Sequence, residues 1–220
     1  NLFAELKAKF DERGDEKFRP TVDTYATLFE ALLYSPLRAE ELLEDMLKDG
    51  LRPNTYIFSN VMIAWSKSLD PCKAAKTLRL LQKMRELKID PALTTFNTAI
   101  GSCARTVGKD EQQTAALKIA FAIFRAMERY QVEPNHVTFS ILFECIGRLL
   151  PPGDERNQVA RALFAKATAK AQIDSSILFK LSKCCDSSVY VELLSAGMKP
   201  NNFGKFDISE IPPEWNRNVR

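Results

Sequence analysis

The chain has 220 residues, of which 45% are hydrophobic and 27% are charged, a composition that is ordinary for a globular protein. Its formal net charge of +3 is too small to identify a nucleic-acid-binding protein, so such a function must rest on where the cations lie. No apolar stretch reaches the roughly 18 residues that a membrane-spanning helix needs, which predicts no membrane partner.

The first residues have the pattern of an amphipathic helix. Residues 2–13 place four apolar side chains on one face at helical spacing: Leu2, Phe3, Leu6 and Phe10. This predicts that residues 1–19 hold the second helix of a partial repeat. The chain begins at Asn1 rather than Met, and we expect that a preceding segment, with any targeting peptide, is missing from this sequence.

One sequence pattern then recurs along the chain: a proline is followed, five positions later, by an aromatic residue. The prolines are Pro20, Pro53, Pro91 and Pro134, and the aromatic residues are Tyr25, Phe58, Phe96 and Phe139. A methionine stands seven residues before each of the last three prolines, at Met46, Met84 and Met127. A period of 33 to 43 residues is typical of stacked repeats. The sequence therefore predicts an all-α fold, a right-handed α-solenoid of antiparallel helix pairs over residues 20–200, with about four full repeats and a degenerate last one.

Each repeat is predicted to contain two helices. The first begins just after the proline, because proline cannot continue the preceding helix, and Asn54, Asn135 and Ser175 stand at N-cap positions. The second helices are predicted at about 38–49, 72–87, 114–130 and 156–171, with polar insertions such as "TVGKDEQQT" before them. We expect their buried faces to contain Ala75, Leu78, Leu81 and Met84 in one unit and Ala116, Ala120, Ile123, Phe124 and Met127 in the next.

The C-terminal part departs from this pattern. Residues 177–185 and 187–196 predict a final, shorter helix pair. Residues 201–220 contain Pro212 and Pro213 and show no helical period, so we expect an extended tail that Trp215 holds against the last helices.

Metal, cofactor and catalytic sites are not predicted. The five cysteines form no C-x-x-C pair, and His136 is the single histidine, so the chain lacks the ligand spacing of a zinc site. Cys103 and Cys145 lie inside apolar runs and are expected to be small core residues in a reducing compartment. His136 has no partner for acid–base chemistry, and no Gly-rich phosphate loop occurs. We therefore expect neither an enzyme nor a small-molecule substrate.

Three segments carry a resemblance to a known family: "LLEDMLKDGLRPN" at 42–54, "TTFNTAI" at 94–100 and "VTFSIL" at 137–142. These units resemble the pentatricopeptide repeat family. The resemblance implies an organellar protein, of a mitochondrion or a plastid, that binds single-stranded RNA in transcript processing, stabilisation or translation. It also implies that the first helices line a concave RNA-binding face.

The family's pattern assigns one RNA base to two residues of neighbouring repeats. The residue after each helix-one aromatic is Ala26, Ser59, Asn97 or Ser140, and the residue after each closing proline is Asn54, Ala92, Asn135 or, in the last unit, Ser175. The pair of Asn97 with Asn135 matches a pairing that favours a pyrimidine, cytidine in particular. The other pairs depart from the common ones.

Two further sets of residues hold equivalent positions in successive repeats. Two positions before each aromatic, side chains that could sandwich a base are Tyr56, Thr94, Val137 and Ile177. Nine positions after three successive aromatics stand Lys67, Arg105 and Arg148, with Tyr34 at the same place in the first unit. Stacked repeats would align these cations into a stripe that could contact a phosphate backbone.

Structural roles remain open for the same residues. The aromatic residues and methionines fit packing between helices, Asn54 and Asn135 fit simple caps, and the three cations fit solvated helix ends. The alternative function is a structural helical-repeat adaptor in an organellar ribosome or another multiprotein complex, which binds protein or folded RNA by shape.

Overall fold

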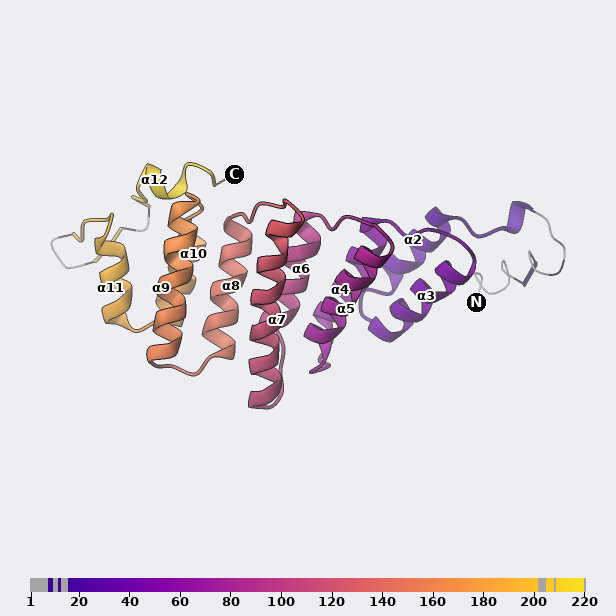
Figure 1. Cartoon of the computed structure of the whole chain (residues 1–220), viewed down its shortest axis with the longest axis horizontal. Coiled ribbons are helices and arrows are strands. Elements are labelled where there is room, and N and C mark those ends of the chain that lie inside the picture. Colours follow the sequence, from indigo (N-terminus) through magenta and orange to yellow (C-terminus); the bar gives the residue numbers. More distant parts are fainter. Residues whose placement is uncertain (1–7, 10–11, 13–15, 202–204, 208, 220) are drawn as a thin grey trace.

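The computed structural model describes residues 8–9, 12, 16–201, 205–207 and 209–219, and every regular element in this part of the chain is a helix (Figure 1). The four residues of the predicted apolar face at 2–13 (Leu2, Phe3, Leu6 and Phe10) lie outside the described residues. The partial N-terminal repeat therefore stays a prediction. The first element described is a short 3₁₀ helix, η1 (Glu16–Phe18).

Residues 22–195 form a row of helix pairs (Figure 1). The first helices of the pairs are α2 (Val22–Ala31), α4 (Thr55–Lys67), α6 (Leu93–Ala104), α8 (His136–Leu149) and α10 (Ser175–Cys184). The second helices are α3 (Pro36–Lys48), α5 (Lys73–Glu86), α7 (Asp110–Arg129), α9 (Asp154–Ala169) and α11 (Ser187–Ser195). Among the described residues, no helix is long and apolar enough to cross a bilayer.

The pairs stack in two layers. The helices α2, α4, α6, α8 and α10 contact one another in succession and form an inner layer, and each packs on the second helix of its own pair. The second helices form an outer layer, in which α5 contacts α7 and α9 contacts α11. This arrangement is an α-solenoid, and it confirms the predicted fold class.

The recurring sequence phrase has a structural cause at each junction between units. A residue with positive φ lies two positions after the end of α3, α5, α7 and α9, namely Gly50, Lys88, Gln131 and Ala171. The amide of the following residue then donates to the carbonyl five residues earlier, as Ile89 N does to Met84 O at 2.8 Å. Asn54 and Asn135 cap the following first helices, accepting from Ile57 N at 3.0 Å and from Thr138 N at 3.1 Å.

The repeated apolar positions form one continuous core. Tyr25, Phe58, Phe96 and Phe139 are buried, as are Met46, Met84 and Met127, so both series pack between helices. One predicted face is wrong: Ala75 is exposed, and Ala74 is buried in its place. The stripe passes through Thr77, a polar residue that is buried because its hydroxyl pairs with Ser102 Oγ at 2.8 Å.

Two other segments differ from expectation. The helix α7 begins at Asp110, four residues before the predicted start, because the polar insertion forms its first turn and Gln112 Oε1 accepts from Lys109 N at 2.7 Å. Asp110 and Glu111 also favour a helix start, since acidic side chains suit the positive end of the helix dipole.

The tail is not wholly extended, because Pro213–Asn216 forms the short helix α12. Trp215 is buried and stacks edge-on against Phe164, with 5.3 Å between the ring centroids. Ile173 stands where the earlier units have proline, and its free amide donates to Trp215 O at 2.7 Å. The tail thus supplies an acceptor to the one unit junction that lacks a proline.

Candidate nucleic-acid interface

The structure brings Asn97 and Asn135 together across a repeat boundary. Asn97 lies on the second turn of α6, and Asn135 is the N-cap of α8. The buried Thr138 hydroxyl lies between them: Oγ1 is 2.7 Å from Asn97 Oδ1 and 3.1 Å from Asn135 Oδ1. The same Oγ1 accepts from Asn135 N at 3.2 Å. The two amides predicted to read one base are therefore held by a common hydroxyl.

The preceding repeat has the same arrangement but lacks the second polar side chain. Ser59 Oγ lies 3.0 Å from Thr95 Oγ1, as Asn97 lies beside Thr138, but the N-cap Ala92 has no polar side-chain atom. Ala26 likewise offers no donor or acceptor to pair with Asn54. Of the positions described, the junction between α6 and α8 is the one where two amide side chains meet.

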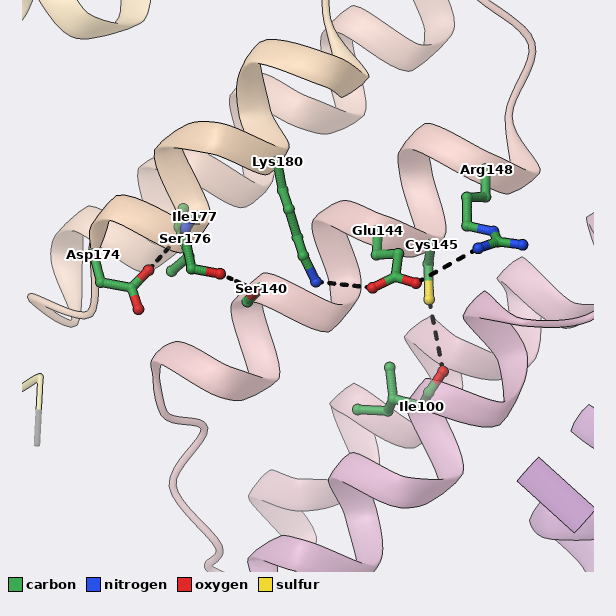
Figure 2. A network of polar contacts seen from close by, with 9 residues as sticks. All are labelled: Ile100, Ser140, Glu144, Cys145, Arg148, Asp174, Ser176, Ile177 and Lys180. Atoms are coloured by element: carbon green, nitrogen blue, oxygen red, sulfur yellow. Dashed lines mark hydrogen bonds and ion pairs between the residues drawn. The ribbon is translucent and has the colours of Figure 1, made fainter. Parts of the chain in front are cut away.

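The last unit is shifted by one residue from the prediction. Asp174, not Ser175, is the N-cap of α10, and its Oδ1 accepts from Ile177 N at 2.7 Å (Figure 2). Ile177 is completely buried, so its predicted base-sandwiching role is wrong. Ser176 takes the equivalent exposed place, and its Oγ lies 3.1 Å from Ser140 Oγ. The proline that sets the register elsewhere is absent here, which caused the error.

The remaining sandwich positions face solvent. The Tyr56 side chain is 50% exposed, and its hydroxyl donates to Glu30 Oε1 at 2.5 Å. Val137 is 39% exposed, and Thr94 is also exposed. These side chains are exposed at the surface of the first helices, and their base-sandwiching role stays a prediction.

The predicted cation stripe lies in one groove. Lys67, Arg105 and Arg148 come from the ends of α4, α6 and α8, and all three line a hollow of about 750 Å³ together with Tyr34. Arg105 follows Asn97 by eight residues, so the cations lie about 12 Å along the helix axis from the predicted base-reading positions.

Neighbouring groups hold these cations in place. Lys67 Nζ lies 4.2 Å from the centroid of the Tyr34 ring, and Arg105 Nη2 donates to Ser66 Oγ at 2.7 Å. Figure 2 shows how Glu144 on α8 lies between Arg148, at 3.8 Å, and Lys180 of α10, at 2.8 Å. Arg148 is thus partly neutralised, whereas no acidic partner is found for Lys67 or Arg105 among the described residues.

Sequence reasoning missed a fourth cation, Lys73, on the first turn of α5. Its side chain is 2% exposed, lines the same groove, and donates to Ser68 O at 2.9 Å. Burial lowers the pKa of Lys73, and the nearby positive charges of Arg105 and Arg148 lower it further. Lys73 falls outside the repeated positions of the first helices, so no periodic signal in the sequence points to it.

Cys103 and Cys145 are buried core residues, and His136 is the first residue of α8. Burial raises the pKa of Cys103 to about 12, and it raises the pKa of Cys145 well above its usual value. The backbone amide of His136 donates to Gln172 Oε1 at 2.7 Å, which ties the start of α8 to the next repeat junction. Within the described residues, no three metal-ligating side chains gather.

Comparison with known proteins identifies the repeats. The family described as the pentatricopeptide repeat domain matches residues 41–106 and 112–148, which contain α4, α6 and α8. The matched part of the chain consists of pentatricopeptide repeats. The matched residues include the pair of Asn97 with Asn135 and all three cations of the stripe.

Pentatricopeptide repeat proteins of known organelles are among its relatives. A chloroplastic pentatricopeptide repeat-containing protein of Arabidopsis thaliana is 25% identical over 146 residues, which are 64% of this chain and 27% of that protein. Pentatricopeptide repeat-containing protein 1, mitochondrial, of Rattus norvegicus is 26% identical over 198 residues, which are 87% of this chain and 26% of that protein. The chain thus spans about a quarter of the length of these relatives.

One solved structure aligns with most of this chain. It is the pentatricopeptide repeat domain of protein-only RNase P 1 from Arabidopsis thaliana, solved in complex with tRNA. The two align with a TM-score of 0.47 and 14% identity, over 92% of this chain and 86% of that one.

Proposed function

We propose that this pentatricopeptide repeat protein binds single-stranded RNA along its inner helix layer. The observation that carries the proposal is the groove in which Lys67, Arg105 and Arg148 gather, beside the row of base-reading positions. A cationic groove attracts the phosphates, and exposed side chains one row away meet the bases. The small net charge of the chain is no obstacle, because Lys67, Arg105 and Arg148 lie together in this groove.

The free atoms of Asn97 and Asn135 favour a pyrimidine. The Oδ1 atoms of both residues are engaged within the protein, so their NH₂ groups remain to donate to a base. Cytosine offers two acceptors on its Watson–Crick edge, whereas guanine offers donors there. This site is therefore expected to prefer cytosine, in agreement with the family's pairing pattern.

The shifted register gives the next site a different preference. Asp174 uses Oδ1 as a cap, and its Oδ2 remains to accept from a base. Guanine carries neighbouring N–H donors on its Watson–Crick edge that suit a carboxylate. Ser140 and Asp174 are thus expected to favour guanine, which would give the RNA two adjacent bases of defined identity.

Stacking contributes roughly 1–3 kcal/mol per base, so four units supply on the order of 4–12 kcal/mol. Lost rigid-body and nucleotide freedom consumes several of these. We expect a dissociation constant of about millimolar to micromolar for this segment. Neighbouring repeats or a ribonucleoprotein partner would supply the rest.

The cellular setting follows from the relatives. One is chloroplastic and another is mitochondrial, which supports a mitochondrion or a plastid as the compartment and an organellar transcript as the target. Processing, stabilisation or translation of that transcript is the proposed task. A fluorescent fusion of the full-length open reading frame tests the compartment, and a signal confined to the cytosol would contradict it.

Binding of RNA oligomers over a salt series tests the function itself. Each phosphate contact with single-stranded nucleic acid contributes a slope of about −0.7 to log K against log salt. We expect the double variant Lys67→Ala/Arg105→Ala to reduce the slope by about 1.4. Arg125→Ala, on the exposed outer face of α7, is the matched control and should leave the slope unchanged.

The second function, a protein adaptor, has one observation in its favour. The pairs at Ala26 and at Ser59 with Ala92 lack the side-chain atoms that would read a base. If no oligomer shows salt-sensitive binding, the RNA proposal is wrong and the adaptor takes its place.

A further inference from the structure

The outer layer contains a groove between α5 and α7, on the face formed by the second helices. Its volume is about 460 Å³, in the range of ligand-binding pockets. Leu78 and Leu81 of α5 form one wall, Ala122 and Ala126 of α7 form the other, and Phe96 of α6 lies at its floor. This apolar hollow is lined by none of the three cations of the RNA-binding groove.

Side chains reach across between three other neighbouring pairs of second helices. Lys76 of α5 forms an ion pair with Glu40 of α3 at 2.9 Å. The Lys166 ammonium of α9 lies 5.8 Å from the centroid of the Phe124 ring of α7. Arg161 of α9 forms an ion pair with Glu192 of α11 at 2.7 Å. No such bridge joins α5 to α7 in the described part of the chain. The helices α5 and α7 contact each other, and the short side chains of Ala122 and Ala126 line the trough between them.

Two arginines stand at one end of this trough. Arg85 lies near the end of α5 and Arg129 is the last residue of α7, and both line the groove. Both side chains are exposed, and neither forms an ion pair with any residue that the structure describes. Two guanidinium groups beside an apolar surface suit a carboxylate, which arginine binds through paired hydrogen bonds.

We propose that the α5–α7 groove binds a segment of a partner protein that carries apolar side chains next to an acidic residue. The apolar side chains fill the space over Ala122 and Ala126, and the carboxylate meets Arg85 and Arg129. Charge complementarity selects an acidic segment over a basic one. RNA is a poorer occupant, because a phosphate would satisfy the arginines but leave the apolar floor exposed to water.

A displayed library of random 16-residue peptides, selected against the whole chain, tests the proposal. We expect the recovered peptides to combine apolar residues with Asp or Glu. A labelled synthetic copy of a recovered peptide should bind at least tenfold more weakly to Arg85→Glu/Arg129→Glu, and also to Ala126→Phe, which fills the trough. Circular dichroism of each variant establishes that it is folded.

The matched control is Arg125→Glu, which reverses an exposed charge on α7 outside the groove lining. It should bind the peptide as the unmodified chain does. The proposal is overturned if no peptide is enriched, if the recovered peptides are basic, or if Ala126→Phe binds them unchanged. A concentration-dependent dimer that Ala126→Phe dissociates would also overturn it, since a second copy of the chain would then be the occupant.

Discussion

Replacing Thr138 with valine isolates the hydroxyl that holds Asn97 and Asn135. Valine keeps the branched shape of the buried side chain but can neither donate to Asn97 Oδ1 nor accept from Asn135 N. Two hydrogen bonds at roughly 1 kcal/mol each give a loss of about 2 kcal/mol in the free energy of unfolding. For a chain of this size, the melting temperature should fall by about 4–8 °C.

The larger effect is expected in base discrimination. With Thr138 in place, the Asn97 amide presents its NH₂ group to the RNA base. Guanine at this site would then place its own N–H donors against this NH₂ group. An unsatisfied buried pair costs about 1–3 kcal/mol, so cytosine should be preferred by roughly tenfold or more. In Thr138→Val the Asn97 amide can rotate and present its oxygen to guanine, and the preference should fall below about threefold. Fluorescence anisotropy with two oligomers that differ at one base measures both values.

Thr95→Val is the matched control, because Thr95 occupies the same position one repeat earlier and is equally buried. Its hydroxyl lies 3.0 Å from Ser59 Oγ, but the partner position holds Ala92, which cannot read a base. This variant should lose stability without any change in base preference. If Thr138→Val keeps the full preference for cytosine, the reasoning about Asn97 is refuted.

Three further predictions concern burial and charge. At pH 8 a thiol reagent should modify the exposed Cys72 quickly and spare Cys103 in the folded chain, because burial raises the pKa of Cys103 to about 12; rapid modification of both would contradict the assigned burial. Gly197→Ala should destabilise the C-terminal part, since an added Cβ would lie 2.3 Å from the Trp215 ring, and an unchanged melting temperature would show that the tail yields freely. The pKa of Lys73 is lowered by burial, so the unfolded state binds its proton more tightly, and the free energy of unfolding relative to Lys73→Met should rise with pH between the lowered pKa and about 10.5. Urea titrations at pH 7 and pH 10 measure this difference, and the opposite slope would contradict the burial of the charge.

Much of the fold could be predicted because each repeat carries the same local signals. Proline ends one helix, the next residue caps the following one, and the aromatic five positions later packs into the core, as Pro134, Asn135 and Phe139 do. These signals are local in sequence and repeat with the unit. Errors arose where a signal was missing: Ile173 replaces proline in the last unit, so Ser175 and Ile177 were assigned one residue too far along.

The candidate site was predictable in its rows but not in its contacts. Stacking places Lys67, Arg105 and Arg148 in one groove because they hold the same position in successive units. The Thr138 hydroxyl contacts Asn97, which lies 41 residues earlier in the chain. Lys73 reaches the groove from a second helix. A periodic pattern within the first helices reveals neither contact. The trough between α5 and α7 likewise depends on side chains of two different units.

The most direct test of the account is a nuclear magnetic resonance titration of the isotope-labelled chain with a short cytosine oligomer. The account predicts that the side-chain amides of Asn97 and Asn135 and the guanidinium of Arg105 shift on binding, while signals from the outer face of α7 stay in place. Shifts confined to α5 and α7, with Asn97 and Asn135 unchanged, would contradict it.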